Sequence, residues 1–112
     1  MNPSWMVTPE KINEAVKTLV REGKPRRVIL FGSAATGKLH MNSDADFLVV
    51  TGADVPSPRK ESVRLRRALR GLSMAMDILV VSEARLKSLA DVPGLIYREA
   101  LKTGRVVYEA AG

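Results

Sequence analysis

Three aspartates stand at the start of apolar runs, where carboxylates are unusual. Asp44 and Asp46 precede Phe47–Val50, and Asp77 precedes Ile78–Val81. Alternate residues of a strand face the same way, so Asp44 and Asp46 would project to one side with their Cα atoms roughly 7 Å apart. Two like charges held this close repel each other unless a proton or a cation offsets the repulsion. Mg²⁺ is a simple choice, since it takes one or two carboxylates and completes its octahedron with water and phosphate oxygens.

A Gly-Ser pair lies ten residues before the first of these aspartates. Gly32 permits a tight turn and a close backbone approach, and the N–H groups that open a following helix bind phosphate well. The hydroxyl of Ser33 adds one more donor, so the pair predicts a phosphate cradle facing the carboxylates. If the strand that carries Asp77 lies beside the strand that carries Asp46, the cluster could bind two metal ions. Such a pair of ions is typical of phosphoryl and nucleotidyl transfer.

The Gly-Ser pair and the three aspartates together match the sequence signature of a known protein family. FGSAATG at Phe31–Gly37 and SDADFLVV at Ser43–Val50, with Asp77 on a later strand, resemble the signature of the polymerase-beta-like nucleotidyltransferases. Within that superfamily the chain is similar to the minimal nucleotidyltransferases of bacteria and archaea, the antitoxin type of HEPN/MNT pairs.

The resemblance implies a role for each residue of the motif. Asp44 and Asp46 would bind the metal associated with the nucleotide, Asp77 would supply the third ligand, and Gly32 with Ser33 would hold the triphosphate. Relatives commonly carry basic residues in the turn after Gly-Ser, whereas this chain has alanines at positions 34 and 35 and a threonine at 36. Lys38 is the candidate that would replace part of the missing charge.

The resemblance also implies a function. Many family members are encoded with a helical HEPN-type partner and act as antitoxins, some by transferring AMP to a tyrosine of that partner. We therefore expect Mg²⁺-dependent transfer of a nucleoside monophosphate, AMP from ATP in the first instance, to a hydroxyl of a HEPN-type protein, with two magnesium ions. Two alternatives stay open: a non-catalytic antitoxin that neutralises its partner by forming a complex, and a nucleotidyltransferase acting on a small molecule or RNA.

Composition narrows the classes of protein. A chain of 112 residues predicts a single domain over residues 1–112. The absence of cysteine excludes disulfides and thiolate metal sites, which leaves oxygen ligands or the single His40 for any metal. No apolar run approaches the roughly 18 residues of a membrane span, and no secretory signal precedes the first helix. We therefore expect a cytoplasmic protein that does not associate with a membrane.

The net charge of the chain favours a polyanionic partner but does not show which kind. Lys and Arg number 18 against 12 Asp and Glu, a net charge of +6, which favours nucleotides, RNA or an acidic protein. Residues 59–70 carry six of the basic side chains. That segment could bind RNA or an acidic partner, or it could be an ordinary solvated helix face, and an RNA partner is not favoured at this point.

Strands and helices alternate along the chain. Thr8 and Pro9 predict a helix start and Gly23 its stop, and apolar spacing predicts a further helix over 59–72. Residues 91–94 open another helix, whose apolar face is Ile96, Tyr97, Ala100 and Leu101 and whose C-cap is Gly104. A short helix is expected after Ser33 and a loop over 37–43. Apolar runs predict strands at 28–31, 46–51, 75–81 and 105–109. The fold class is therefore α/β (α+β), with helices packed on a small mixed sheet, because the 37–43 loop is too short for a parallel crossover.

Overall fold

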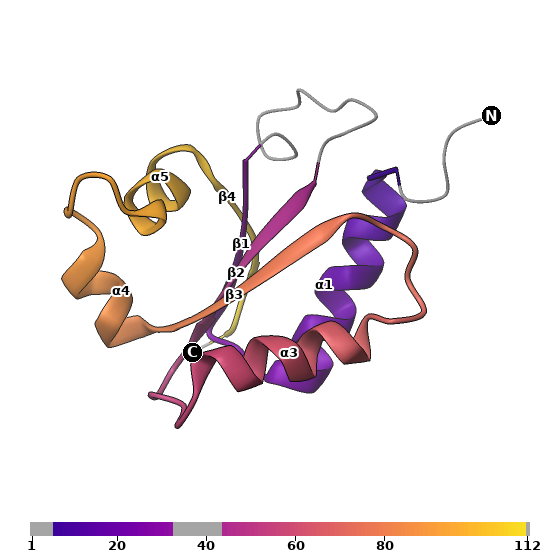
Figure 1. Ribbon diagram of the computed structural model, residues 1–112, viewed down its shortest axis with the longest axis horizontal. Helices are drawn as coiled ribbons and strands as arrows, with labels where there is room; N and C mark the ends of the chain where they lie inside the picture. The colour runs from indigo at the N-terminus through magenta and orange to yellow at the C-terminus, as the bar shows by residue number, and fades with distance from the viewer. Residues whose placement is uncertain (1–5, 33–43, 112) are drawn as a thin grey trace.

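A four-stranded sheet organises the chain (Figure 1). The computed structural model describes residues 6–32 and 44–111. In these residues the strands are β1 (Arg27–Phe31), β2 (Ala45–Thr51), β3 (Met76–Ser82) and β4 (Arg105–Glu109), in the spatial order β3-β2-β1-β4. β1 pairs antiparallel with β2 and with β4, whereas β2 and β3 are parallel. The mixed sheet expected from the short connection after β1 is confirmed.

Helices cover both faces of this sheet. α1 (Pro9–Gly23) and α3 (Pro58–Ala68) lie on one side, and α4 (Glu83–Leu89) and α5 (Ile96–Thr103) lie on the other (Figure 1). α3 connects β2 to β3, as a parallel pair requires, since the chain must return to the end from which it started. None of the helices in the described part of the chain is long and apolar enough to cross a membrane.

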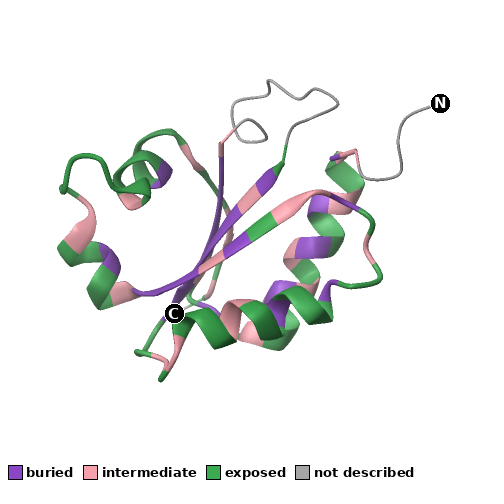
Figure 2. Cartoon of the chain, viewed as in Figure 1, coloured by how far each residue is buried: buried purple, intermediate pink, exposed green. Residues whose placement is uncertain are grey.

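Most residues of β1 and β2 are buried (Figure 2). Strand alternation divides their apolar side chains into two cores. Val28, Leu30, Phe47 and Val49 belong to the core under α1 and α3, together with the helix residue Leu65. The second core packs against α4 and α5 and consists of Ile29, Phe31, Leu48, Val50, Val81, Leu86 and Ala100. Because β1 and β2 are buried on both faces, they read as continuous apolar runs rather than as alternating ones.

Local sequence explains where the helices begin. The hydroxyls of Thr8, Ser57 and Ser82 accept hydrogen bonds from the backbone N–H three residues later, at 3.2, 3.3 and 3.2 Å, at the starts of α1, α3 and α4. These bonds satisfy donors that have no partner within the helix. Pro9 and Pro58 follow two of the caps, at first-turn positions that need no N–H.

Two helix predictions need correction at their ends, and one helix was missed. α1 continues through Gly23, and Lys24 is the residue that adopts the left-handed conformation, with φ of 44°. α3 ends at Ala68 rather than at residue 72, because the chain turns from Leu69 onward to reach β3. α4 was not predicted, since seven residues are too few to show a clear apolar period.

α4 is fixed to the sheet by a polar contact as well as by Leu86. The guanidinium of Arg27 in β1 forms an ion pair with the carboxylate of Glu83, and each side chain is only 23% exposed. Partial burial reduces solvent screening, so this pair contributes more than a surface ion pair would. It joins the first residue of β1 to the first turn of α4.

α5 buries a narrower face than the sequence predicts. Ala100 is buried and Tyr97 is half-buried against the second core, whereas Ile96 and Leu101 are 44% and 40% exposed. A helical period places all four on one side but cannot show how wide a stripe the sheet covers.

Gly104 allows the end of α5 to approach β1 closely. A Cβ atom added here would clash with the carbonyl oxygen of Ala100 and would lie 2.8 Å from Cγ2 of Ile29. Gly104 caps the helix as predicted, but its φ of −76° is open to any residue. Space, rather than conformational freedom, is the reason for glycine at this position.

We expect Gly104→Ala to lower the free energy of unfolding by about 2 kcal/mol, as overpacking does at a tight site. Urea denaturation followed by circular dichroism measures the change. Gly71→Ala is the matched control, because a Cβ there meets no atom within 4 Å. Equal stability of the two variants would contradict the close packing at Gly104.

Candidate active site

The sheet topology brings two of the predicted aspartates side by side. Asp46 in β2 is the direct register partner of Asp77 in the parallel strand β3. On its other side Asp46 is opposite Phe31, the last residue of β1. The site therefore lies at the end of the sheet where β1 finishes and where β2 and β3 begin (Figure 1). The condition that the sequence analysis set for Asp77, that its strand lies beside the strand of Asp46, is therefore met.

The residues that follow Asp46 alternate between the two faces of the sheet. Phe47 and Val49 belong to the core under α1 and α3, and Leu48 and Val50 belong to the core under α4 and α5. Strand alternation then places Asp46 on the α4/α5 side of the sheet. Asp46 is half-buried, whereas Asp44 and Asp77 are exposed.

Burial and like charge act together on Asp46. Its pKa is raised above 3.8, first because partial burial disfavours the ionised form and then because Asp44 and Asp77 repel its charge. The repulsion shows that the three carboxylates act on one another across the end of the sheet. A cation placed among them would relieve it.

Gly32 lies against the carboxylate of Asp46. A Cβ atom added at Gly32 would be 2.5 Å from Oδ2 of Asp46, a separation that real Cβ atoms do not show. Gly32 also has φ of +75°, a conformation that side chains rarely adopt. Gly32 and the second aspartate are thus adjacent, and glycine is needed at position 32 for two independent reasons.

The outer edge of β3 has its backbone groups satisfied beside Asp77. Oδ1 of Asp77 accepts a hydrogen bond of 3.1 Å from the N–H of Ile78. The guanidinium of Arg66 in α3 donates to the carbonyl of Met76, also at 3.1 Å. Arg66 of α3 thus binds the backbone of the residue that precedes Asp77 in β3. The sequence did not single it out, because it was one of several basic residues on a helix.

Carboxylate chemistry fits magnesium, although the described residues do not enclose a metal. In residues 6–32 and 44–111 no group of three or more acidic or histidine side chains converges closely enough to hold an ion. Mg²⁺ commonly needs only one or two carboxylates, its remaining ligands being water and substrate phosphates. Asp46 with either neighbour meets that requirement, and the raised pKa of Asp46 identifies the place where a positive charge is favourable.

Part of the predicted site lies outside the described residues. Ser33, Lys38 and His40 fall there, as do the short helix and the loop expected over residues 34–43. Their roles stay predictions.

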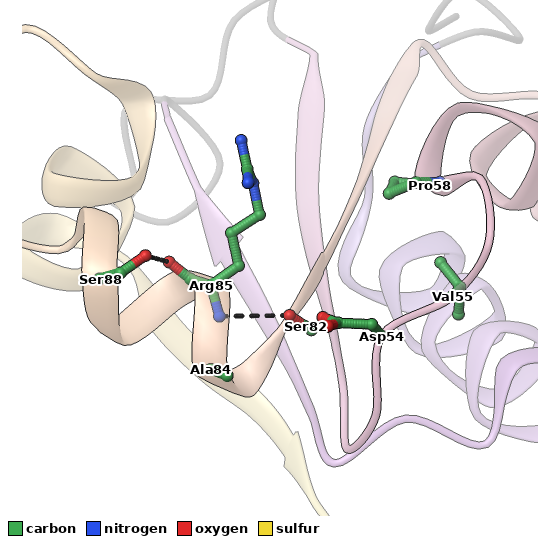
Figure 3. A pocket seen from close by; sticks show the side chains of 7 residues that line it. All are labelled: Asp54, Val55, Pro58, Ser82, Ala84, Arg85 and Ser88. Atoms are coloured by element: carbon green, nitrogen blue, oxygen red, sulfur yellow. Dashed lines mark hydrogen bonds between the residues drawn. The ribbon is translucent and has the colours of Figure 1, made fainter.

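A separate pocket lies at the opposite end of β2 and β3 (Figure 3). It encloses about 690 Å³ between the segment after β2 and α4. The hydroxyl of Ser82 accepts from the N–H of Arg85, and the hydroxyl of Ser88 donates to the carbonyl of Arg85. These polar groups serve the helix itself, and none of the predicted site residues lines the pocket.

A mixed sheet with carboxylates at the start of two parallel strands and a glycine turn against one of them defines a nucleotidyltransferase-type fold. The family model "Polymerase beta, Nucleotidyltransferase" matches residues 10–111. The chain belongs to this family. No protein of curated function matches it significantly in sequence.

Solved structures share the fold. A candidate nucleotidyltransferase from Sulfolobus solfataricus superposes with a TM-score of 0.61 and 22% identity, over 89% of this chain and 78% of that one. A mutant of the toxin-antitoxin complex MntA-HpeT gives 0.60 and 19%, over 88% and 72%. A toxin-antitoxin structure with AMP-PNP gives 0.52 and 22%, over 87% and 73%.

We expect Gly32→Ala to be more destabilising than Gly94→Ala. Both glycines have positive φ, but a Cβ at Gly94 meets no atom within 4 Å, so that variant measures the backbone strain alone. Strain should cost about 1 kcal/mol at each site, and the contact with Asp46 should add about 1 kcal/mol at Gly32. Urea denaturation of both variants tests this, and equal losses would contradict the contact.

We expect Asp46→Asn to stabilise the metal-free protein at pH 7. A carboxyl whose pKa is raised on folding destabilises the folded state when ionised, so the penalty is absent below pH 3.8 and develops as pH rises through the raised pKa. The gain should be no more than about 1 kcal/mol, because solvent screens a half-buried group. Thermal unfolding in EDTA from pH 4 to 8 measures it, and a variant less stable than wild type at pH 7 would refute the repulsion.

Proposed function

We propose that this protein transfers AMP from ATP, with magnesium, to a hydroxyl of a protein partner of the helical HEPN type. The observation that carries the proposal is the juxtaposition of Gly32, Asp46 and Asp77 at one end of the sheet. It occurs in a chain of the polymerase beta nucleotidyltransferase family.

The proposed reaction is a displacement at the α-phosphorus of ATP. The acceptor oxygen forms a bond to that phosphorus, the bond to the bridging oxygen of pyrophosphate breaks, and the hydroxyl proton is lost to solvent or to a carboxylate. Asp44, Asp46 and Asp77 would hold magnesium, which when bound offsets charge on the triphosphate and favours the deprotonated acceptor. The backbone at Gly32 comes close enough to Asp46 to place phosphate oxygens near these carboxylates.

The position of Asp77 suggests the side from which the acceptor arrives. β3 is an edge strand and Asp77 is exposed on it, whereas Asp46 lies between β1 and β3. An acceptor hydroxyl on a second molecule could therefore approach Asp77 without displacing any residue of the described segments.

A protein acceptor is supported by the apolar surface on the same side of the sheet. Several large apolar side chains beyond α4 and along α5 and β4 are 38–51% exposed, namely Val92, Leu95, Ile96, Leu101 and Val106. A protein partner that covers α5 and β4 would bury these side chains. The two toxin-antitoxin neighbours, one with AMP-PNP, are consistent with such an assembly and with an adenine nucleotide.

Transfer of label from α-³²P-ATP to a purified HEPN-type protein encoded beside this chain tests the proposal. We expect labelled partner with wild type and magnesium, and a loss of about 100-fold or more for Asp44→Ala with Asp46→Ala. Asp54→Asn is the matched control, because Asp54 lies in the pocket at the opposite end of the sheet. Absence of transfer by wild type, or equal transfer by the double variant, would refute the activity.

A non-catalytic antitoxin is the second candidate. It is favoured by one observation, that the described residues contain no converged group of three metal ligands. In that case the chain would neutralise its partner by covering a surface, and neutralisation would survive replacement of all three aspartates by asparagine. Loss of neutralisation in that variant, with the complex still forming, would select the enzyme.

A further inference from the structure

Nearly all of the net charge of this protein is concentrated on α3 and the turn that follows it. Residues 58–70 contain six basic side chains and one acidic one, a net charge of +5. The remaining 12 basic and 11 acidic residues of the chain nearly cancel, at +1. A distribution this uneven is the electrostatic signature of a surface that binds a polyanion.

α3 presents these charges on a continuous outward face. Leu65 and Leu69 point into the core, and a shallow groove of about 510 Å³ follows the outer side of the helix. The groove is lined by Ser57, Arg59, Lys60, Val63, Arg64 and Arg67. Within α3, from Arg59 to Arg67, the cations span about 12 Å along the axis, at about 1.5 Å per residue.

Most of these cations are not used within the described structure. Arg64 and Arg66 are the exceptions. Arg64 forms hydrogen bonds of 2.7 and 2.8 Å to Glu61 and donates to the carbonyl of Glu22, and Arg66 donates to the carbonyl of Met76. The hydrogen bond from Arg64 lowers the pKa of Glu61, so the single acidic residue of the helix is committed to one partner. The side chains of Arg59, Lys60, Arg67 and Arg70 form no ion pair with any residue of the described segments.

The chemistry of this face suits phosphate rather than bases or a protein surface. Residues 57–70 include no Asn, Gln or aromatic side chain that could read or stack on a base. They include one exposed large apolar residue, Val63, whereas the other exposed apolar side chains gather around α5 and β4. Arginine predominates, and its guanidinium matches phosphate oxygens in a bidentate manner.

We propose that the outward face of α3 binds the phosphate backbone of folded, double-stranded RNA. The major groove of A-form RNA is deep and narrow and is bordered by two rows of phosphates, so a single row of cations on a flat-lying helix can contact both rows. α3 and Asp46 lie on opposite faces of the sheet. RNA bound to α3 would therefore leave the candidate nucleotide site accessible, and the inference does not depend on the proposed transfer activity.

Fluorescence anisotropy with a 20-base-pair RNA hairpin, in KCl from 50 to 250 mM without magnesium or nucleotide, tests the proposal. With about four phosphate contacts, the logarithm of the association constant should fall against the logarithm of salt with a slope near −3 to −4. Replacement of Arg59, Lys60, Arg67 and Arg70 by Gln should weaken binding at least about 10-fold at 100 mM and flatten the slope to near −1. Arg67→Gln alone should reduce the slope by about 1, which covers the case of a quadruple variant that does not fold.

A control of equal charge separates the surface from net charge. Arg85, Lys87, Arg98 and Lys102 are exposed on α4 and α5, and their replacement by Gln removes the same four charges from the other face of the sheet. This variant should retain binding within about twofold of wild type. Equal loss in both quadruple variants would overturn the proposal, as would unchanged binding by the α3 variants.

The nucleic acid itself has a control. A DNA hairpin of the same sequence should bind more weakly, because the wider major groove of B-form DNA separates the two rows of phosphates. Equal or tighter binding of DNA would overturn the assignment to RNA. If wild type binds no RNA and the α3 variant loses a protein partner instead, α3 is a docking surface for an acidic protein and the proposal is wrong.

Discussion

The parallel pairing of β2 with β3 is the constraint on which the rest of this structure depends. It places Asp46 directly beside Asp77, because both residues stand near the start of their strands. An antiparallel pairing of β2 and β3 over their full length would put the two aspartates at opposite ends of the pair. A parallel pair also requires the chain to return along the sheet, and α3 makes that return. The parallel pairing of β2 and β3 therefore brings Asp46 and Asp77 together at one end of the sheet, and it also requires the crossover helix α3 that carries the basic residues.

The carboxylate cluster is an unfavourable feature that the surrounding sheet tolerates. Ala45 and Phe47, the neighbours of Asp46 in β2, are fully buried, and Phe31 opposite it is nearly so. These side chains hold the backbone of Asp46 in place while Asp44 and Asp77 raise its pKa. Natural proteins commonly retain such local destabilisation where a ligand will relieve it. The packing under β2 is therefore what allows the repulsion to persist.

Much of the fold could be predicted because several signals agreed at each element. Capping residues and apolar period together identified α1, and the short connection after β1 identified the antiparallel pair. The width of the buried face of α5 was harder to predict, as the exposed side chains of Ile96 and Leu101 show. A helical period shows which side of a helix is apolar, but not how much of that side the sheet covers. α4 escaped notice because it is short. At the site, spacing identified the aspartates and Gly32, but only the coordinates show that Gly32 touches Asp46.

The hydrogen bonds at the start of β3 have a consequence for behaviour at high concentration. An unpaired edge strand offers its free N–H and C=O groups to a strand from another molecule, which is a common route to aggregation. Here the carbonyl of Met76 and the N–H of Ile78 are already occupied by Arg66 and by Asp77 itself. Asp77 also puts a negative charge on that edge. Asp77, for which we propose a role at the acceptor hydroxyl, therefore also protects the edge of β3 against self-association, and this second role does not depend on any catalysis.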